Sequence, residues 1–476
     1  MKLIVTAALF ATGSTGALHD APPCVRPGRG GVEVQGDVRI CPGRYIVRDP
    51  IERGVIVVIS SNTRVDLSGV SLESGDTLAS AFVGAGVTSQ GLNNVSIIGG
   101  AISGYRYGVR INGGRGHRVR DIGLSGSRAQ RLHSTPHVFN EADWLDIFRP
   151  DTFEQYGGGV YLKNTEDATV TGVTAHGAQN GIVLFNVRRA YIADNDVSGN
   201  SGWGISLWRS AHNTIARNQA HHSVRCEGET YHQGCDSAAL LMRQESDSNT
   251  IIENDLSGSG DGFFLSGHRP LLQPSVGNLV LRNDATGAFH NAFESTFSWG
   301  NSFIENHADS SGYGFWLGYS SGNLVRGNTI LGSRNTGIAI EHGSDNVLSG
   351  NVIIGGRTGI WLFAPGDSGE PSRGYHLDDN VLARLDRGVV LERTTQARLR
   401  GNLFDGVQDG LVVDGAGRGS EVLGNVFLRA ARSYIQAPEL TAGGNYWGAA
   451  DAEATMTKVK GKVTIQPWRP ASAAGY

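Results

Sequence analysis

Three carboxylate residues stand at the start of neighbouring apolar segments, and their spacing could support acid–base chemistry. Asp236, Asp261 and Glu294 belong to the segments CDSAALLM, GDGFFLSG and NAFES. If these segments are strands stacked in register, the carboxyl groups lie one or two strand spacings apart, roughly 5–10 Å. That separation covers both arrangements used for glycoside hydrolysis, a close pair and a wider pair with a water between them. Repulsion among the three would raise the pKa of one carboxyl group and make it a proton donor, so all three are candidate catalytic residues.

The two aspartates also have a structural interpretation. Asp261 precedes a glycine, and Asp409 has the same Asp-Gly context far along the chain. An aspartate in such a turn can accept hydrogen bonds from backbone amides. Glu294 favours catalysis more strongly, because equivalent outward positions in later segments carry Trp316 and Trp361.

Aromatic and ionisable side chains accompany these carboxylates. In each Gly-apolar-x-apolar-x segment, the two apolar positions face one side of a strand and the x positions face the other. Sugar rings stack on Trp and Tyr, and sugar hydroxyls form hydrogen bonds with Arg, Glu and His. The candidate substrate-binding residues are Lys163, Trp208, Arg209, Arg243, His268, Trp316, Tyr319 and Glu341.

A second chemistry uses the cationic residues of the same surface. Lyases and C5-epimerases that act on uronates abstract the proton next to a carboxylate, so they need a base and a cation that neutralises this carboxylate. Lys163, Arg209, Arg243, His268 and His342 could supply these groups.

A repeated asparagine indicates which elements position these residues. Each repeat of about 22 residues contains three short apolar stretches separated by Gly, Ser and Asn, which are typical of strands bounded by turns. The repeat predicts an all-β fold, a single-stranded right-handed parallel β-helix of about 13–14 coils. The repeated asparagines are Asn195, Asn218, Asn254, Asn283, Asn306, Asn328, Asn351, Asn380, Asn402 and Asn425.

These asparagines are expected to form a ladder along the solenoid. Equivalent residues of successive coils stack at the strand spacing, so each side-chain amide can bond to the next. Asparagine also tolerates the left-handed backbone conformation that a tight corner needs. We therefore interpret the ladder as structural rather than catalytic.

The repeat divides the chain into four segments. Residues 1–17 have the pattern of a signal peptide: Lys2, an apolar run from Leu3 to Ala11, and then Thr15-Gly16-Ala17. A buried N-terminal strand is the alternative. Residues 18–50 are expected to form an N-terminal cap, 51–448 the β-helix, and 449–476 a C-terminal cap or tail. The apolar run is too short to span a membrane, so we expect an exported protein, periplasmic or extracellular.

Four cysteines form two close pairs in the sequence, Cys24 with Cys41 and Cys226 with Cys235. In an oxidising compartment such pairs predict two local disulfides. The alternative for the second pair is metal binding together with nearby histidines, which are His221, His222 and His232. The spacing is not that of a CxxC motif, so we favour the disulfide and expect neither a metal nor another cofactor.

Composition and insertions restrict the partners. The net charge of −4, without a basic run, argues against nucleic acid and anionic membrane surfaces. Insertions in a solenoid map to loops on its side, often on the binding face. Four interrupt the repeat here, at residues 127–157, 220–235, 268–275 and 364–374, and the first three fall in neighbouring coils that could form the wall of a groove. A poly- or oligosaccharide is the expected partner, and the oligomeric state stays open.

Several segments resemble the repeats of right-handed parallel β-helix proteins. GISLWRSAHNTIARNQ, GFWLGYSSGNLVRGNTI and GIAIEHGSDNVLSGNVI match that pattern over about residues 50–448. The nearest type is NosD-like, with repeats of the carbohydrate-binding and sugar hydrolysis (CASH) type. The resemblance implies the β-helix fold. Its members include pectin and alginate lyases, epimerases, polygalacturonase-like hydrolases and accessory proteins for the copper site of nitrous oxide reductase.

The residues and the resemblance together predict an exported carbohydrate-active protein. It would bind a poly- or oligosaccharide along its first-strand groove and cleave a glycosidic bond there. One alternative is a polysaccharide lyase or uronate C5-epimerase. The other is a NosD-like periplasmic protein that binds or assembles without catalysis.

Overall fold

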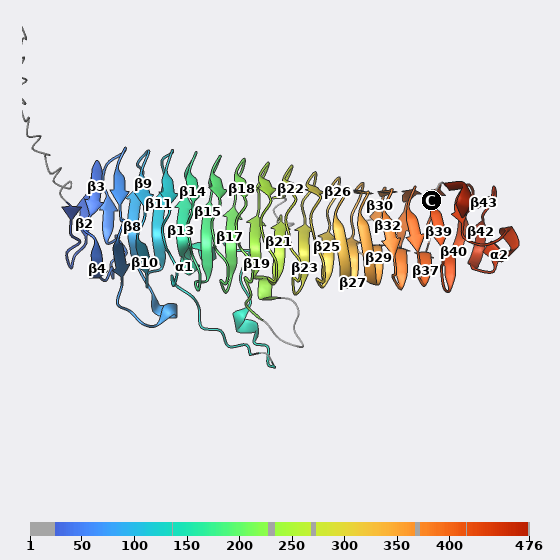
Figure 1. Ribbon diagram of the computed structural model, residues 1–476, viewed down its shortest axis with the longest axis horizontal. Coiled ribbons are helices and arrows are strands. Elements are labelled where there is room, and N and C mark those ends of the chain that lie inside the picture. Colours follow the sequence, from blue (N-terminus) through green and yellow to red (C-terminus); the bar gives the residue numbers. More distant parts are fainter. Residues whose placement is uncertain are drawn as a thin grey trace, which may run out of the picture.

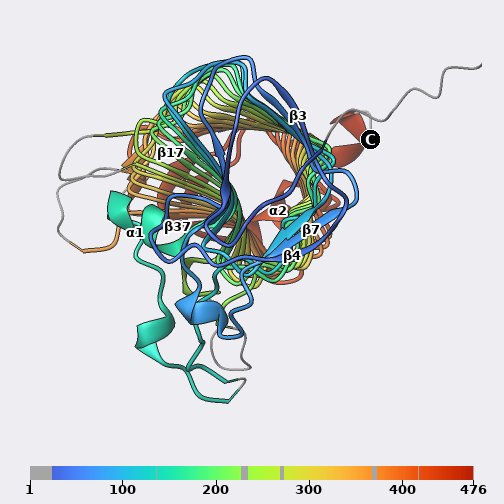
Figure 2. The ribbon, with the colours of Figure 1, turned by 90° about the vertical axis from the view of Figure 1, so that its left-hand side faces the viewer.

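The chain forms a long parallel β-helix, as the repeat predicts (Figure 1). The computed structural model describes residues 24–474 except 136, 227–233, 268–272, 367–371 and 416. His232 and His268 therefore lie outside the described residues. Figure 2 shows the coils stacked behind one another along the axis, with the loops projecting to one side.

One face of the rod is a sheet of 16 short parallel strands. Most of its strands have three residues, of which the middle one is buried. In chain order they are β1 (Cys24–Val25), β3 (Asp37–Ile40), β6 (Arg64–Asp66), β9 (Ser96–Ile98), β12 (Arg118–Arg120), β14 (Thr169–Thr171), β16 (Tyr191–Ala193), β18 (Thr214–Ala216), β20 (Thr250–Ile252), β22 (Leu279–Leu281), β24 (Ser302–Ile304), β26 (Leu324–Arg326), β28 (Val347–Ser349), β31 (His376–Asp378), β35 (Arg398–Arg400) and β38 (Glu421–Leu423).

A second face, here called the site face, carries the longer strands and the predicted site residues. Each of its strands pairs in parallel with the equivalent strand of the next coil. They are β2 (Val32–Val34), β5 (Ile56–Val58), β8 (Ala85–Gln90), β11 (Tyr107–Asn112), β13 (Gly158–Lys163), β15 (Asn180–Phe185), β17 (Trp203–Trp208), β19 (Ala238–Arg243), β21 (Asp261–Ser266), β23 (Asn291–Thr296), β25 (Tyr313–Gly318), β27 (Thr329–Glu341), β29 (Val352–Phe363), β33 (Arg387–Glu392), β37 (Asp409–Asp414), β40 (Ser433–Thr441) and β42 (Val459–Thr464).

The third face is the least regular. In the middle of the rod it narrows to single bridges, such as Asp255 to Asp284 and Asp284 to His307. Its strands near the two ends are β4 (Gly43–Ile46), β7 (Val70–Glu73), β10 (Ala101–Ser103), β32 (Val381–Ala383), β36 (Leu403–Asp405), β39 (Val426–Leu428), β41 (Tyr446–Trp447) and β43 (Arg469–Pro470). A separate pair consists of β30 (Ser372–Arg373) and β34 (Thr394–Thr395).

Helices are few and short. They are η1 (Ala79–Ala81), η2 (Glu141–Asp143), α1 (Pro150–Tyr156), η3 (Gly234–Asp236), α2 (Ala452–Met456) and η5 (Ala471–Ala474). None of the helices among the described residues has the length and apolarity needed to cross a membrane.

The interior of the rod is a stack of apolar side chains. On the site face every second residue points inward, so Phe263, Phe293 and Phe315 of successive coils overlie one another, with 4.9 Å between the last two ring centroids. The second position of these strands is commonly glycine because the coils approach closely there. A Cβ on Gly181, for example, would lie 2.5 Å from the carbonyl oxygen of Gly204.

The predicted asparagine ladder is confirmed. The Nδ2 of each asparagine from Asn195 onward donates to the Oδ1 of the next, at 2.8–3.1 Å, and the ladder extends by one further step from Asn425 to Asn445. A second, shorter ladder runs beside it and was not predicted. It consists of Asn213, Asn249, Asn278, Asn301, Asn323 and Asn346.

One detail of the ladder prediction is wrong. The left-handed residue is not the ladder asparagine but the residue immediately before it, for example Arg217 before Asn218 and Glu253 before Asn254. The asparagine side chain must point along the axis to reach the next coil, whereas the preceding residue makes the corner. Glycine occupies that preceding position at Gly327 and Gly350, where the positive φ costs it least.

The ends of the rod lengthen it beyond the prediction. The sheet of 16 strands exceeds the predicted 13–14 coils because β1 and β3, from residues 24–46, extend it at the N-terminal end, whereas the segment after 449 adds strands to the other faces only. Those segments lack the ladder asparagine, so the repeat does not reveal them. Cys24 is bonded to Cys41 and Cys226 to Cys235, which confirms both predicted disulfides.

The insert at residues 127–157 covers part of the site face. Figures 1 and 2 show it leaving the rod, carrying η2 and α1, and returning to β13. Its residues Leu145, Ile147 and Phe153 are buried in one apolar cluster with Trp203 and Trp208 of the sheet. The insert therefore closes the N-terminal half of the site face and leaves the coils after β23 outside its cover.

Candidate functional site

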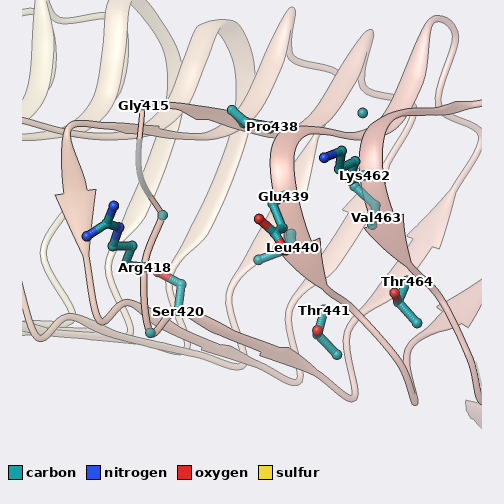
Figure 3. A pocket seen from close by; sticks show the side chains of 13 residues that line it. Gly415, Arg418, Ser420, Pro438, Glu439, Leu440, Thr441, Lys462, Val463 and Thr464 are labelled. Atoms are coloured by element: carbon teal, nitrogen blue, oxygen red, sulfur yellow. The ribbon is translucent and has the colours of Figure 1, made fainter.

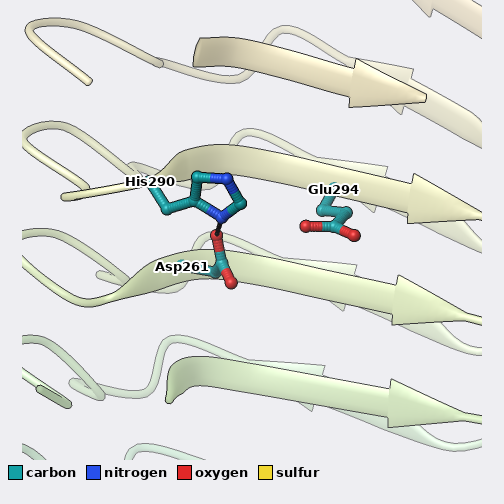
Figure 4. Close-up of side chains that lie close together, drawn as sticks. All are labelled: Asp261, His290 and Glu294. Atoms are coloured by element: carbon teal, nitrogen blue, oxygen red, sulfur yellow. Dashed lines mark ion pairs between the residues drawn. The ribbon is translucent and has the colours of Figure 1, made fainter. Parts of the chain in front are cut away.

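The predicted carboxylates Asp261 and Glu294 come together with a histidine at the edge of the insert. Asp261 begins β21, His290 immediately precedes β23, and Glu294 lies within β23 (Figure 4). One donor atom from each of the three lies within 4.8 Å of the others. We call these three residues the acid–base centre.

Asn291 fixes the geometry of this centre. Its backbone N–H donates to Asp261 Oδ1 at 2.9 Å, and its side-chain Nδ2 donates to Glu294 Oε2 at 2.5 Å. The Nδ1 of His290 lies 3.3 Å from the same Asp261 oxygen. Asp261 thus accepts a backbone amide, as the structural interpretation of Asp-Gly turns predicts, and also orients the imidazole.

Burial separates the three side chains by accessibility. The side chain of Asp261 is 1% exposed and that of His290 is 31% exposed. Glu294 is 9% exposed and faces outward in the row of Phe264 and Trp316. A ligand on the site face can therefore meet His290 and the edge of Glu294, whereas Asp261 lies behind them.

The environment of Glu294 favours the protonated form of its carboxyl group. Burial, followed by repulsion from Asp261, raises its pKa to about 8, although the charge of His290 acts in the opposite direction. The same carboxylates, chiefly Asp261, raise the pKa of His290 to about 9 against the opposing effect of burial. At pH 7 both Glu294 and His290 hold a proton.

Asp236 approaches the centre from η3. Burial raises its pKa to about 6, and a hydrogen bond from Trp144 Nε1 to Asp236 Oδ2, 2.8 Å long, partly offsets that effect. Trp144 belongs to the insert, and the backbone N–H of Leu145 donates to the carbonyl of Cys235 beside it. The disulfide loop and the insert therefore hold Asp236 between them.

Replacing Trp144 by phenylalanine is expected to raise the pKa of Asp236 above 6. The substitution removes the indole donor that stabilises the ionised carboxylate, while the ring still packs in the same place. A titration followed by carboxyl ¹³C NMR would measure this shift. Trp299→Phe is the matched control, because Trp299 is exposed on a distant loop. An unchanged pKa for Asp236 in Trp144→Phe would contradict the assigned hydrogen bond.

Two predicted substrate-binding residues do not lie in an open groove. Trp208 is 2% exposed beneath Phe153 of the insert, with the ring centroids 5.0 Å apart. Arg243 is fully buried, and it donates to the carbonyls of Ile147 and Gly267. Trp208 points out of the sheet as predicted, and Arg243 is the last residue of β19 rather than a residue past the strand; both anchor the insert instead of meeting solvent.

Two other predicted cations have partners of their own. Lys163 forms an ion pair with Glu154 of α1 and lies 5.2 Å from the centroid of the Phe185 ring. Arg209 pairs with Glu245 at 3.2 Å. Both cations are therefore already paired within the protein.

Beyond the insert the site face carries a line of aromatic rings, of which Tyr313, Trp316 and Trp361 are half-buried and Phe363 is buried. The centroid of Tyr313 lies 6.4 Å from that of His290 and 5.0 Å from that of Trp316. Trp316 in turn contacts Phe363, which stacks on Trp361 with the centroids 3.8 Å apart. We call Tyr313, Trp316, Trp361 and Phe363 the aromatic track, and it leads away from the centre towards the C-terminal coils.

Tyr319 and Glu341 lie at the far side of the same strands. Tyr319 stacks on Phe297 and on His342, with centroid distances of 5.1 and 4.8 Å. Glu341 ends β27, and one of its carboxylate oxygens lies 3.9 Å from His342 Nε2. Of the predicted binding residues, Trp316 lies nearest to the acid–base centre, because it pairs with Glu294 of the neighbouring strand.

The family assignment follows from the sequence. The family described as "Periplasmic copper-binding protein (NosD)" matches residues 61–284 and 271–464, which together span most of the rod. This chain belongs to the NosD family. The NosD family is described as periplasmic, and the two disulfides of this chain are consistent with export.

Solved structures similar to this NosD-family chain include bacterial epimerases. The A-module of the mannuronan C-5 epimerase AlgE6 from Azotobacter vinelandii is 12% identical, with a TM-score of 0.47, over 82% of this chain and 91% of that one. The AlgE4 A-module from the same organism is 12% identical, with a TM-score of 0.48, over 74% and 88%. The periplasmic alginate epimerase AlgG is 14% identical, with a TM-score of 0.41, over 83% and 84%. These likenesses concern the fold alone. No curated protein matches the sequence.

The acid–base centre is also the place where this NosD-family chain could hold a metal ion. Among the described residues, a single group of at least three His, Cys, Asp or Glu side chains has its donor atoms within 4.8 Å of one another. It consists of Asp261, His290 and Glu294. They offer one imidazole nitrogen and two carboxylate oxygens. Such ligands suit divalent ions and not the soft copper(I) ion, which prefers thiolates and thioethers.

A separate depression of about 950 Å³ lies near the C-terminal end of this NosD-family rod (Figure 3). Its polar lining comes from the loop after β37 and from β40 and β42, and includes Arg418, Ser420, Glu439, Lys462 and Thr464. No residue of the acid–base centre or of the aromatic track lines it, so it is not part of the site described here.

Sequence reasoning missed His290, Asn291 and Tyr313. His290 lies in the turn before β23, where strand alternation does not fix the direction of a side chain. Asn291 and Tyr313 occupy the outward position at the start of consecutive strands, in the row that Asp261 also occupies. Aligning the first residues of the site-face strands, and not only their centres, would have found these two.

Proposed function

We propose that this NosD-family protein binds a glycan along the uncovered part of the site face and cleaves a glycosidic bond at the acid–base centre. The observation that carries the proposal is the raised pKa of the Glu294 carboxyl group at the edge of the uncovered site face. This group is protonated at neutral pH because of its burial, yet it lies at the edge of the insert, beside a half-exposed histidine and the aromatic track.

Hydrolysis needs an acid and a base with separated pKa values. Glu294, with a pKa of about 8, donates its proton to the oxygen of the leaving sugar. Asp236, with a pKa of about 6, is mostly ionised at pH 7 and activates the attacking water. Asp261, the third candidate carboxylate, is not assigned as the base because it is buried behind His290.

Asp261 and His290 then act by position and charge. Asp261 holds the imidazole through its contact with Nδ1, and the protonated ring presents its other nitrogen to the site. Its N–H can donate a hydrogen bond to a sugar hydroxyl and so orient the ring beside Glu294. Asn291 keeps Glu294 in place through its amide.

The aromatic track supplies the binding surface. Trp316 and Tyr313 form an edge-to-face pair beside the centre, and Trp361 with Phe363 forms a stacked pair farther along. Because equivalent positions of successive coils are about 4.8 Å apart, an extended chain of sugar rings can follow this row of rings.

The proposal is tested by incubating the protein with a panel of neutral and uronate-containing polysaccharides and reading the products by mass spectrometry. Hydrolysis adds one water to the mass for every bond that is cut. Such products support the proposal. If every glycan stays intact and none binds, the carbohydrate function is wrong and an assembly role takes its place.

A uronate lyase or C5-epimerase is the second candidate, and the contact between Asp261 and His290 favours it. An aspartate-oriented histidine is a common proton-transfer group. Its pKa of about 9 means that His290 is protonated at pH 7 and would serve first as a cation or acid. Products with a ring double bond, or deuterium incorporation at C5 without chain cleavage, would identify this chemistry.

The NosD family is described as copper-binding, so a copper site in this chain has to be considered. The described cysteines are all in disulfides, Met242 is fully buried in the core, and Met456 stands alone on α2, so the described residues bring no sulfur ligands together for copper(I). A divalent ion would be held by Asp261, His290 and Glu294. Its charge would remove the protons from His290 and Glu294, so metal binding and acid catalysis by Glu294 exclude each other. Calorimetric titration with copper(II), with His290→Ala as the comparison, distinguishes the two.

A further inference from the structure

A depression lined by arginines lies on the site face beyond the aromatic track. Its volume is about 520 Å³, and its lining residues are Arg357, Asp386, Arg387, Gln408 and Arg432. Arg387 begins β33, and Arg357 lies within β29 directly before Thr358, the residue that pairs with Arg387. The depression therefore opens to the same side of the rod as the acid–base centre.

The charge of this depression is only partly compensated. Arg432 pairs with Asp409 at 2.6 Å, which leaves Asp386 as the one carboxylate in the lining. Arg357 and Arg387 have no ion pair within the described parts of the chain. The remaining lining charges are two arginines and one aspartate, so the depression carries a net positive charge. The protein as a whole has a net charge of −4.

The strand register connects the depression to the acid–base centre. Asn291 pairs with Tyr313, Tyr313 with Thr336, Thr336 with Thr358, and Thr358 with Arg387. Arg387 is thus four coil steps from Asn291, roughly 19 Å along the axis. The charge of Arg357 also lowers the pKa of Tyr313, against the larger raising effect of burial, which shows that its field reaches the aromatic track.

We propose that the glycan is anionic and that its carboxylate or sulfate groups bind Arg357 and Arg387 while the chain continues over the aromatic track to Glu294. The inference rests on the proposed function and specifies its substrate class. A guanidinium group offers two parallel N–H donors that match a carboxylate or a sulfate. A neutral glycan gains nothing from these donors beyond ordinary hydrogen bonds.

Binding of three oligosaccharides of similar length tests the proposal by calorimetry with the full chain. The probes are an oligogalacturonate, a sulfated dextran oligomer and a neutral dextran oligomer. The double variant Arg357→Ala/Arg387→Ala is expected to bind the anionic probe about tenfold more weakly or worse, and to lose most of the salt dependence of binding. Its affinity for the neutral probe should not change.

A charge-matched control separates local contacts from the total charge. Arg120→Ala/Arg326→Ala removes two arginines from β12 and β26 of the opposite sheet and should leave all three affinities as they are. Comparing the oligogalacturonate with the sulfated probe shows which anionic group the arginines select. Lysine at both positions keeps the charge but not the paired donors, so it should restore only part of the affinity.

The outcomes distinguish this inference from the function on which it rests. If the neutral probe binds or is cut as well as the anionic ones, and the arginine double variant is unaltered, the glycan is not anionic but the proposed function stands. If none of the glycans binds or is cut, both are wrong. Tighter binding of an anionic probe that depends on Arg357 and Arg387 supports both.

Discussion

Replacing Glu294 by glutamine is expected to lower kcat on a cleaved glycan by about 10²–10⁴-fold, the usual contribution of a positioned general acid. Glutamine has the same shape, and its side-chain oxygen can still accept from Asn291 Nδ2. It has no acidic proton to give to the leaving sugar. Affinity for the glycan should change little, because the aromatic track is untouched.

The pH dependence of the rate provides an independent readout. The activity of the unmodified protein should fall as pH rises through about 8, where Glu294 loses its proton. The residual activity of Glu294→Gln should not show that fall. Asp414→Asn, at the exposed end of β37 on the same face, is the matched control and should behave like the unmodified protein. A rate within a few-fold of normal for Glu294→Gln would remove Glu294 from the mechanism.

The same substitution should change how stability depends on pH. The folded-state pKa of Glu294 is raised from 4.5 to about 8, so between these values the folded protein binds a proton that the unfolded chain has released. Stability therefore falls as pH rises through this window. His290, raised from 6.5 to about 9, acts in the same direction over its own window. Thermal unfolding at pH 5 and pH 8.5 should show a smaller drop for Glu294→Gln than for the unmodified protein.

Replacing Asn328 in the middle of the ladder by alanine is expected to destabilise the fold by about 3–6 kcal/mol. Asn328 Oδ1 accepts from both the backbone N–H and the side chain of Asn306, and its Nδ2 donates to the carbonyl of Phe303. Alanine leaves the backbone N–H of Asn306 and the carbonyl of Phe303 buried without these partners, at about 1–3 kcal/mol each. Asn306 Nδ2 keeps its bond to the carbonyl of Val280, but the bond from Asn328 to Asn351 is lost as well. Urea unfolding followed by circular dichroism would measure the loss.

Two further variants show that the loss comes from the ladder. Asn335→Ala, in the following coil, removes a half-buried asparagine whose side chain forms no hydrogen bond with the described residues, so it should cost far less. Asn328→Asp keeps the acceptor but buries a charge, so it should be most damaging at high pH and partly rescued when the carboxyl group is protonated. If Asn328→Ala unfolds at the same urea concentration as Asn335→Ala, the ladder does not stabilise the rod.

The sequence predicted the features that repeat from coil to coil. The asparagine spacing predicted the parallel β-helix, and strand alternation placed Glu294 in the same outward row as Trp316. Both inferences depend only on neighbouring residues and on the strand spacing. The same holds for the two disulfides, each of which closes a short loop.

The features that depend on long-range contacts were not predictable in this way. Trp208 and Arg243 have the alternation of exposed residues, but the insert, which precedes them by many positions in the chain, buries them. His290 lies in a turn, where no periodicity fixes its direction. Asp261 was predicted as a site residue, but its burial was not. That burial comes from the packing of the turns around it, and it makes Asp261 an orienting group.

The attachment of the insert constrains the order in which the protein can fold. Trp144 and Leu145 bond to Asp236 and Cys235, about ninety residues later in the chain. A chain that crosses a membrane N-terminus first delivers the insert well before the coil that holds it, and contacts of such sequence separation form slowly. Trp203 and Trp208 then remain uncovered until that coil has closed and the bond between Cys226 and Cys235 can form. A chaperone or a disulfide-forming enzyme would act on this exposed aromatic surface at that stage, so the yield of folded protein should depend more on this step than on the closing of any later coil.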